Sequence, residues 1–161
     1  MNTTVTPTNN CILFLDFDGV THPEPSPSDQ AHCLLPLIEA VLREHPTVEI
    51  VISSSWRDHY TLEEMRDFFA PDIGARLIGV TPSIKNPGSD WLPGHVPEYE
   101  REWEIESWMK SNRPWGTPWL AIDDRHYWFR PDCSNLLLTD RLTGFGPDDQ
   151  DTLRAMLLER L

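Results

Sequence analysis

The feature that most constrains the fold of this chain is a short apolar run that ends in two aspartates. Residues 11–15 read Cys-Ile-Leu-Phe-Leu, and Asp16-Phe17-Asp18-Gly19 comes directly after them. Such a run, closed by a glycine that lets the backbone turn, predicts a buried strand. Because side chains alternate along a strand, we expect Asp16 and Asp18 to share a face, with Phe17 pointing away. Two crowded carboxylates repel each other, so the pair indicates a bound cation or a shared proton.

The rest of the chain alternates apolar runs with helical patterns. Residues 34–42 carry apolar side chains at the spacing of one helix face, and Thr61 with Glu64 has the signature of a capping box. Strands that alternate with helices form a mostly parallel sheet covered on both faces, so we expect a Rossmann-like three-layer α/β/α fold. The predicted strands are residues 11–15, 48–52, 75–80, 119–122 and 135–139, and the predicted helices are residues 34–42, 62–69, 98–112 and 148–161.

Polar residues stand after three of the predicted strands, at the point where each strand ends. Asp16 and Asp18 come after the first, Ser53 after the second, and the pair Asp123-Asp124 after the fourth. In parallel sheets, ligands bind beyond the carboxyl ends of the strands. We therefore expect these three segments to converge on one functional site.

Length and charge limit the classes of protein that fit. The 161 residues suit one domain, so we expect a flexible leader over residues 1–10 and a single domain over residues 11–161. A net charge of −13 disfavours non-specific attraction to nucleic acid or anionic membranes. We expect no membrane segment and no secretory signal, and the three widely spaced cysteines predict reduced thiols in or near the core of a cytoplasmic protein.

These motifs, taken in order, resemble those of the haloacid dehalogenase (HAD) superfamily of phosphotransferases. The first motif of that superfamily is matched by Asp16-Phe17-Asp18-Gly19, the second by Ser53, and the fourth by Asp123-Asp124. The third is a Lys or Arg near the start of a later helix. We favour Arg101, which opens a helix directly before the acidic strand, over Lys85, which lies in a proline-rich loop.

A closer resemblance is to a small bacterial subgroup, the HAD domain associated with RNA-repair (Swiss Army Knife) proteins. It rests on Ser53-Ser54-Ser55-Trp56-Arg57 and on residues 101–108 and 121–125. The resemblance implies that Asp16 is the nucleophile of an aspartyl-phosphate intermediate. It also implies that Asp18 protonates the leaving oxygen and later accepts a proton from the attacking water.

The same resemblance implies a Mg²⁺ cofactor, which oxygen ligands select. Asp16, the backbone carbonyl of Asp18 and the carboxylate of Asp123 would supply its protein ligands. Asp124 would hold metal-bound water or orient the basic residue, and Arg101 would balance charge on the transferred phosphoryl group.

Several neighbouring residues are candidates for binding substrate. Ser53 would hydrogen-bond the phosphoryl oxygens, with Ser54 adding a contact. Arg57 is expected either to bind phosphate or to form a salt bridge with Asp58 or another acid. We retain Trp56 and Trp91 as residues that could stack on a substrate, while most of the other tryptophans are expected to anchor the core and loops.

The spacing of the motifs leaves no room for a cap domain. Residues 19–52 hold a loop, one helix and one strand, and the proline-rich loop of residues 81–97 is a flap at most. An open site favours a bulky phosphorylated substrate, so the leading hypothesis is a phosphomonoesterase acting on a nucleic-acid or nucleotide end. The alternatives are a small-molecule phosphatase or nucleotidase closed by that loop or a partner, and a non-catalytic binding module. The acidic helix of residues 98–106 is expected to present a solvated face.

Overall fold

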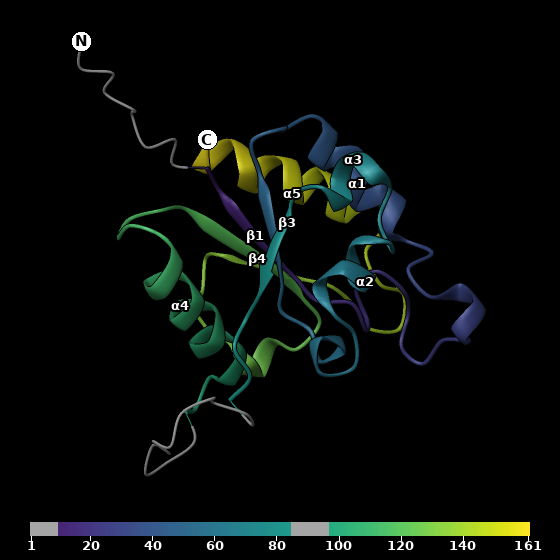
Figure 1. Ribbon diagram of the computed structural model, residues 1–161, viewed down its shortest axis with the longest axis horizontal. Helices are drawn as coiled ribbons and strands as arrows, with labels where there is room; N and C mark the ends of the chain where they lie inside the picture. The colour runs from purple at the N-terminus through teal and green to yellow at the C-terminus, as the bar shows by residue number, and fades with distance from the viewer. Residues whose placement is uncertain (1–9, 85–96) are drawn as a thin grey trace.

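The computed structural model describes residues 10–84 and 97–161, and five parallel strands form its central sheet (Figure 1). The predicted α/β fold with a mostly parallel sheet is confirmed. Lys85, Trp91 and all but the last residue of the predicted leader lie outside the described residues. The strands, in the spatial order β3-β2-β1-β4-β5, are β1 (Ile12–Leu15), β2 (Glu49–Ile52), β3 (Leu77–Val80), β4 (Trp119–Asp123) and β5 (Leu136–Leu138).

Helices cover the sheet on both faces. In Figure 1, α1 (Leu35–Arg43), α3 (Pro71–Gly74) and α5 (Pro147–Arg160) lie on one side, and α4 (Glu100–Asn112) lies on the other. The shorter α2 (Leu62–Arg66) contacts β3. The described residues include three short 3-10 helices, η1 (Ser28–Gln30), η2 (Ser55–Asp58) and η3 (His126–Trp128).

The second predicted helix starts where expected and ends early. The Thr61 hydroxyl accepts from the Glu64 backbone N–H, and the Glu64 carboxylate accepts from the Thr61 N–H, so the capping box is confirmed. Residues 67–69 are not helical, because Pro71 begins the separate helix α3 and Ala70 is extended before it. The Glu39 carboxylate accepts the Ala70 N–H at 2.7 Å, which fixes this break. The third strand consequently begins at Leu77, two residues later than predicted.

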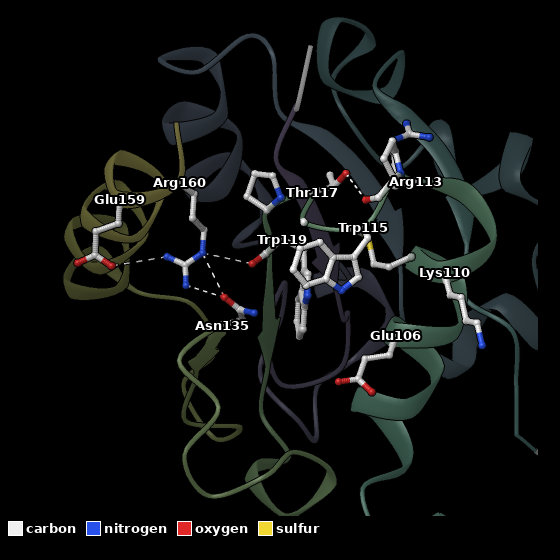
Figure 2. Close-up of a pocket in the computed structure, with 13 residues that line it drawn as sticks. Glu106, Lys110, Arg113, Trp115, Thr117, Trp119, Asn135, Glu159 and Arg160 are labelled. Carbon is white, nitrogen blue, oxygen red and sulfur yellow. Dashed lines mark hydrogen bonds and ion pairs between the residues drawn. The ribbon is translucent and has the colours of Figure 1, made fainter. Parts of the chain in front are cut away.

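A pocket of about 860 Å³ lies at the amino edge of the sheet, where β4 begins (Figure 2). The Arg160 guanidinium, from the end of α5, donates there to the Trp119 carbonyl at 3.2 Å and to the Asn135 side chain at 2.7 Å. Trp115 is fully exposed beside this pocket, so it anchors neither core nor loop, contrary to the general expectation for the tryptophans.

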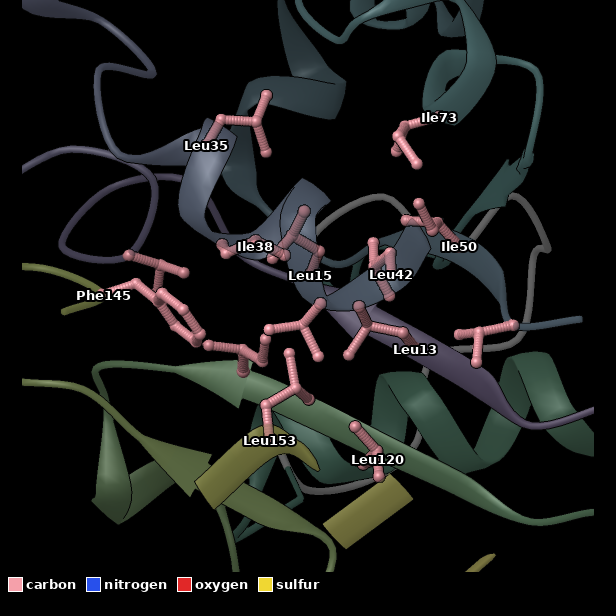
Figure 3. Close-up of a cluster of buried hydrophobic side chains, with 14 of the residues drawn as sticks. Leu13, Leu15, Leu35, Ile38, Leu42, Ile50, Ile73, Leu120, Phe145 and Leu153 are labelled. Atoms are coloured by element: carbon pink, nitrogen blue, oxygen red, sulfur yellow. The ribbon is translucent and has the colours of Figure 1, made fainter. Parts of the chain in front are cut away.

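Two apolar clusters sandwich the sheet. Leu13 and Leu15 pack with residues of α1, α3 and α5, such as Leu153 (Figure 3). Ile12 and Phe14 pack on the opposite face with residues of α4. Full burial of each such side chain contributes about 1.5–3 kcal/mol relative to exposure. The same alternation places Asp16, which directly follows β1, on the α4 side of the sheet.

No cap is evident in the described residues. The segment between β1 and β2 holds η1 and α1, and the one between β2 and β3 holds η2, α2 and α3. None of the described helices is long and apolar enough to cross a membrane. The cysteines are free thiols, but Cys33, just before α1, is exposed, so the prediction that all three lie in or near the core is wrong.

Candidate active site

Three carboxylates meet at the carboxyl edge of the sheet. Asp16 comes directly after β1, Asp123 ends β4, and Asp124 comes next; one oxygen of each lies within 4.8 Å of the other two. The two strands are parallel neighbours, with Leu15 paired to Ile122, so the residues at their ends are adjacent. The structure therefore brings together the first and fourth motifs, which are far apart in the sequence.

The protonation equilibria of this cluster reflect its burial. Burial, with repulsion from Asp123 as the next cause, raises the pKa of Asp16 well above its usual value. Burial is also the main cause that raises the pKa of Asp123 to about 6, against the lowering influence of Arg101. Burial and mutual repulsion disfavour the ionised forms of these carboxylates. A cation bound between them would stabilise the ionised forms.

Asp124 is the least satisfied member of the cluster. Its side chain is 1 % exposed, and neither carboxylate oxygen accepts a hydrogen bond. The Arg125 Nε atom lies 3.7 Å from Oδ2. Gly19, at φ +74°, permits the close approach of the first motif, because a Cβ atom there would overlap the Asp124 carboxylate. Buried carboxylate oxygens without donors are suitable ligands for a hard divalent cation, so these three residues could hold a metal ion.

Arg101, from the first turn of α4, is the basic group beside the three carboxylates. Its Nη1 atom lies 3.2 Å from Asp123 Oδ2 and 3.5 Å from Asp16 Oδ1, and its guanidinium carbon lies 4.9 Å from the Trp128 ring centre. Burial lowers the pKa of Arg101, but Asp123, Asp16 and Glu104 outweigh it and the net shift is upward. The residue preferred for the third motif thus contacts the first and fourth motifs.

The two serines after β2 differ in their surroundings. Ser53 is fully buried, and its hydroxyl has no hydrogen-bond partner. The Ser54 hydroxyl accepts from the Trp56 N–H at 3.3 Å and caps η2. Of the two hydroxyls, the one of Ser53 has no hydrogen-bond partner and the one of Ser54 already accepts a bond.

The family was established by comparison with known proteins. Residues 12–149 match the family model of the HAD domain in Swiss Army Knife RNA repair proteins. The chain belongs to this family. No curated protein and no solved structure matches the chain. The match runs from the first residue of β1 into α5, so it spans the positions of the four motifs predicted from the sequence.

The second aspartate of the first motif lies outside the carboxylate cluster of this HAD domain. One oxygen of Asp18 accepts from His22 Nε2 at 2.8 Å, and both oxygens accept from Trp56 Nε1 at 3.1 Å. The hydrogen bond from His22 is the main reason that the pKa of Asp18 is lowered. Asp18 is therefore not one of the three grouped carboxylates, because β1 ends at Leu15 and the chain turns Asp18 toward these donors.

The tautomer of His22 is set by its neighbours. Its Nδ1 atom accepts from the backbone N–H of His32 at 3.1 Å, which leaves the proton on Nε2, where it points to Asp18. Burial lowers the pKa of the His32 side chain to about 4, so this second imidazole is neutral at physiological pH.

Arg57 forms the salt bridge that was one of its two predicted roles, but with an unforeseen acid. Its Nη2 atom lies 2.7 Å from Glu104 Oε2, and its Nη1 atom donates to the Thr81 hydroxyl at 3.0 Å. Burial lowers the pKa of Arg57. Glu104 is buried, as is Glu102, which pairs with an arginine of the segment after β4. The prediction that this acidic stretch is a solvated face is wrong at Glu102 and Glu104, whereas Glu106 is exposed.

Three residues of the site were not assigned to it from the sequence: His22, Glu104 and Trp128. Glu104 lies one helical turn after Arg101, and its carboxylate lies 3.7 Å from the Arg101 Nε atom. That spacing was a usable signal, because residues three apart on a helix are neighbours. His22 and Trp128 lie outside the α-helices and the five strands, where spacing in the sequence predicts no contact.

Proposed function

We propose that this HAD domain is a Mg²⁺-dependent phosphomonoesterase that works through an aspartyl-phosphate on Asp16. The observation that supports this most is the set of buried polar atoms left without partners at the carboxyl edge. They include the Ser53 hydroxyl and both carboxylate oxygens of Asp124, which accept no hydrogen bond, although Arg125 Nε lies 3.7 Å from Asp124 Oδ2. Buried polar atoms normally have hydrogen-bond partners. Unpartnered carboxylate oxygens are suited to a metal cation, and an unpartnered hydroxyl is suited to a phosphate oxygen.

Asp16 and Asp123, together with the backbone carbonyl of Asp18, would hold the metal ion, and Asp124 would hold a water molecule bound to it. The ion would supply positive charge to the phosphoryl oxygens and to the crowded carboxylates. The burial and repulsion that raise the pKa of Asp16 make this charge necessary, since only the ionised carboxylate is a nucleophile.

The reaction would proceed in two displacements at phosphorus. In the first, an Asp16 oxygen attacks phosphorus, the bond to the leaving oxygen breaks, and Asp18 gives that oxygen a proton. In the second, water attacks the phosphorus, Asp18 takes a proton from it, and the Asp16–phosphorus bond breaks to release phosphate. Arg101 and the Ser53 hydroxyl would stabilise charge on the equatorial oxygens during both steps.

The hydrogen bonds to Asp18 bear on its two roles. With His22 and Trp56 donating to it, the Asp18 carboxylate is ionised in the free protein, which suits the base of the second step. For the first step it must take up a proton when the substrate arrives. A phosphate dianion placed beside the carboxylate favours that uptake, because a nearby like charge raises the pKa of an acid.

The substrate class draws on family membership and on the open site. The family model describes HAD domains of RNA repair proteins, and no cap is evident in the described residues. We therefore propose that the phosphate removed is one at an accessible nucleic-acid end. The net charge of −13 implies that recognition is local to the end and not spread along the strand.

Release of phosphate tests the proposal. Wild type should hydrolyse para-nitrophenyl phosphate and end-phosphorylated RNA oligonucleotides in Mg²⁺ and lose this activity in EDTA. Asp16→Asn should lower the rate by at least about 10³-fold, because it removes the nucleophile. Asp72→Asn, an exposed aspartate paired with Arg43 away from the site, is the matched control and should keep full activity. Equal rates for wild type and Asp16→Asn would end the proposal.

A further inference from the structure

Besides the pocket at the amino edge, the protein has a cavity at the carboxyl edge of the sheet, and Asp18 is one of the residues that line it. It has a volume of about 760 Å³, within the range of small-molecule sites, and lies between the segment after β1 and the segment after β2. Asp18 is the residue that would protonate the leaving oxygen. A cavity that begins at Asp18 is therefore placed to receive the leaving group and not the phosphoryl group.

Aromatic rings form one wall of this cavity. The Trp56 and Tyr60 rings are stacked, with centres 5.3 Å apart and planes 21° apart, and Phe68 meets Tyr60 edge-on at 5.4 Å. Trp56 has one ring face covered by Tyr60 and its ring N–H bound to Asp18, so it supports the wall. Tyr60 is 39 % exposed, whereas Trp56 and Phe68 are half-buried, so Tyr60 is the most accessible of the three rings.

The charges around the cavity restrict what it can hold. Its lining includes the carboxylates of Asp18 and Glu24, and no lysine or arginine is among the described residues that line it. Asp18 already accepts from His22, and Arg125 Nη2 lies 3.6 Å from Glu24, so an anionic leaving group would meet carboxylates whose nearby donors are already engaged. A flat, uncharged group can instead stack on Tyr60 at little electrostatic cost.

We propose that this cavity binds the leaving group of the substrate, that this group is an uncharged aromatic one such as a nucleoside, and that Tyr60 is the residue that recognises it. The inference rests on the proposed phosphatase activity for its assignment of the leaving group. It adds that the terminal nucleoside enters the cavity, so any further phosphates of a strand must lie outside it. Specificity then depends on one ring that the sequence motifs do not include.

Binding of an uncharged nucleoside tests the inference without relying on turnover. Calorimetric titration with adenosine should show binding to wild type and to Asp16→Asn, and about tenfold weaker binding to Tyr60→Ala, since stacking on an aromatic ring is lost. Tyr60→Phe keeps the ring and should bind as wild type does. Trp115→Ala, an exposed aromatic at the opposite edge of the sheet, is the control and should also bind normally. Absence of adenosine binding to wild type, or equal binding to Tyr60→Ala, would overturn the inference.

Kinetics separate this inference from the proposed function. Tyr60→Ala should raise KM about tenfold for adenosine monophosphate while kcat stays near the wild-type value, because the stacking is lost and the reacting groups are intact. The KM for glycerol 2-phosphate, which has no ring, should not change. Equal increases in KM for both esters would contradict the inference and leave the phosphatase activity standing. Adenosine binding without release of phosphate from any ester would retain the nucleoside site and remove the proposed function.

Discussion

The two edges of the same sheet differ in whether their polar side chains have hydrogen-bond partners. At the amino edge, Arg160 donates to three backbone carbonyls and to the Asn135 side chain, so its hydrogen-bonding capacity is nearly used. Figure 2 shows its contacts with Trp119 and Asn135. At the carboxyl edge, the Ser53 hydroxyl and both oxygens of Asp124 are buried without hydrogen-bond partners. β4 begins at the first edge and ends at the second, so one strand connects both environments.

The comparison shows that cavity size is a poor guide to chemistry in this protein. The amino-edge pocket, at about 860 Å³, is larger than the cavity beside Asp18, at about 760 Å³. The difference lies in polar satisfaction, because buried groups that lack partners cost free energy unless a ligand supplies them. Substitutions that alter this satisfaction at one edge or the other therefore test whether the two edges differ in function.

Removal of Arg101 should have the largest effect at the carboxyl edge. In Arg101→Met, three carboxylates lose the cation that contacts two of them at 3.2 and 3.5 Å. Loss of one partner from a buried ion pair costs about 3–5 kcal/mol, and loss of a transition-state donor costs about 10²- to 10³-fold in kcat. Denaturant unfolding and phosphate release measure the two effects.

The conservative variant shows whether charge or shape is responsible. Arg101→Lys keeps the positive charge but loses the planar contact with Trp128, whose ring centre lies 4.9 Å away. We expect it to recover most of the stability and part of the activity. If Arg101→Met unfolds at the same denaturant concentration as wild type, the carboxylate cluster does not depend on this cation.

Much of this edge could be predicted from the sequence. The apolar run before Asp16 and the one before Asp123 place both residues at strand ends, and parallel strands bring such ends together. Periodicity is a local property, and here local pattern and global fold agree. The positions of Asp16, Asp123 and Ser53 follow from the apolar strands that precede them in the sequence.

The failures share one physical cause, which is that the partner of a polar side chain is decided by tertiary packing. Glu104 looks like part of a solvated helix face, yet Arg57, from a distant segment, pairs with it at 2.7 Å in a buried contact. Asp18 continues the alternation of β1 in the sequence, yet the backbone turns, and His22 and Trp56 donate to its carboxylate. None of these three partners can be predicted from the spacing of residues in the sequence.

The next effect in size is on the pH dependence of stability. Because the folded-state pKa of Asp123 is raised to about 6 from 3.8, and that of Asp16 is also raised, the folded protein binds protons more tightly than the unfolded chain. Metal-free stability should therefore increase as pH falls from above 6 toward 4, by on the order of 2 kcal/mol. Mg²⁺ should reverse this trend, raising Tm by about 4–8 °C at pH 7.5 and by little at pH 5, where protons compete for the same oxygens.

Asp124→Asn is the control for that experiment. The substitution keeps the shape of the side chain and removes one of the three charges in the cluster. We expect a smaller Mg²⁺-induced increase in Tm at pH 7.5 and a flatter pH profile of the metal-free protein. Thermal unfolding at several pH values, with Mg²⁺ or EDTA, measures both. Parallel profiles with and without Mg²⁺ would show that the cluster is not a metal site.

The smallest effects on catalysis should come from the amino edge, and they complete the comparison. Arg160→Met removes donors to the carbonyls of Trp119, Ser134 and Met156, so the free energy of unfolding should fall by about 1–2 kcal/mol. The kcat and KM for phosphate release, measured well below Tm, should equal those of wild type, because the carboxyl edge at the other end of β4 is unchanged. Trp115→Ala, which removes a fully exposed ring, should change neither stability nor kinetics. A loss of activity in either variant would mean that the two edges are coupled through the sheet. The amino edge would then also take part in function.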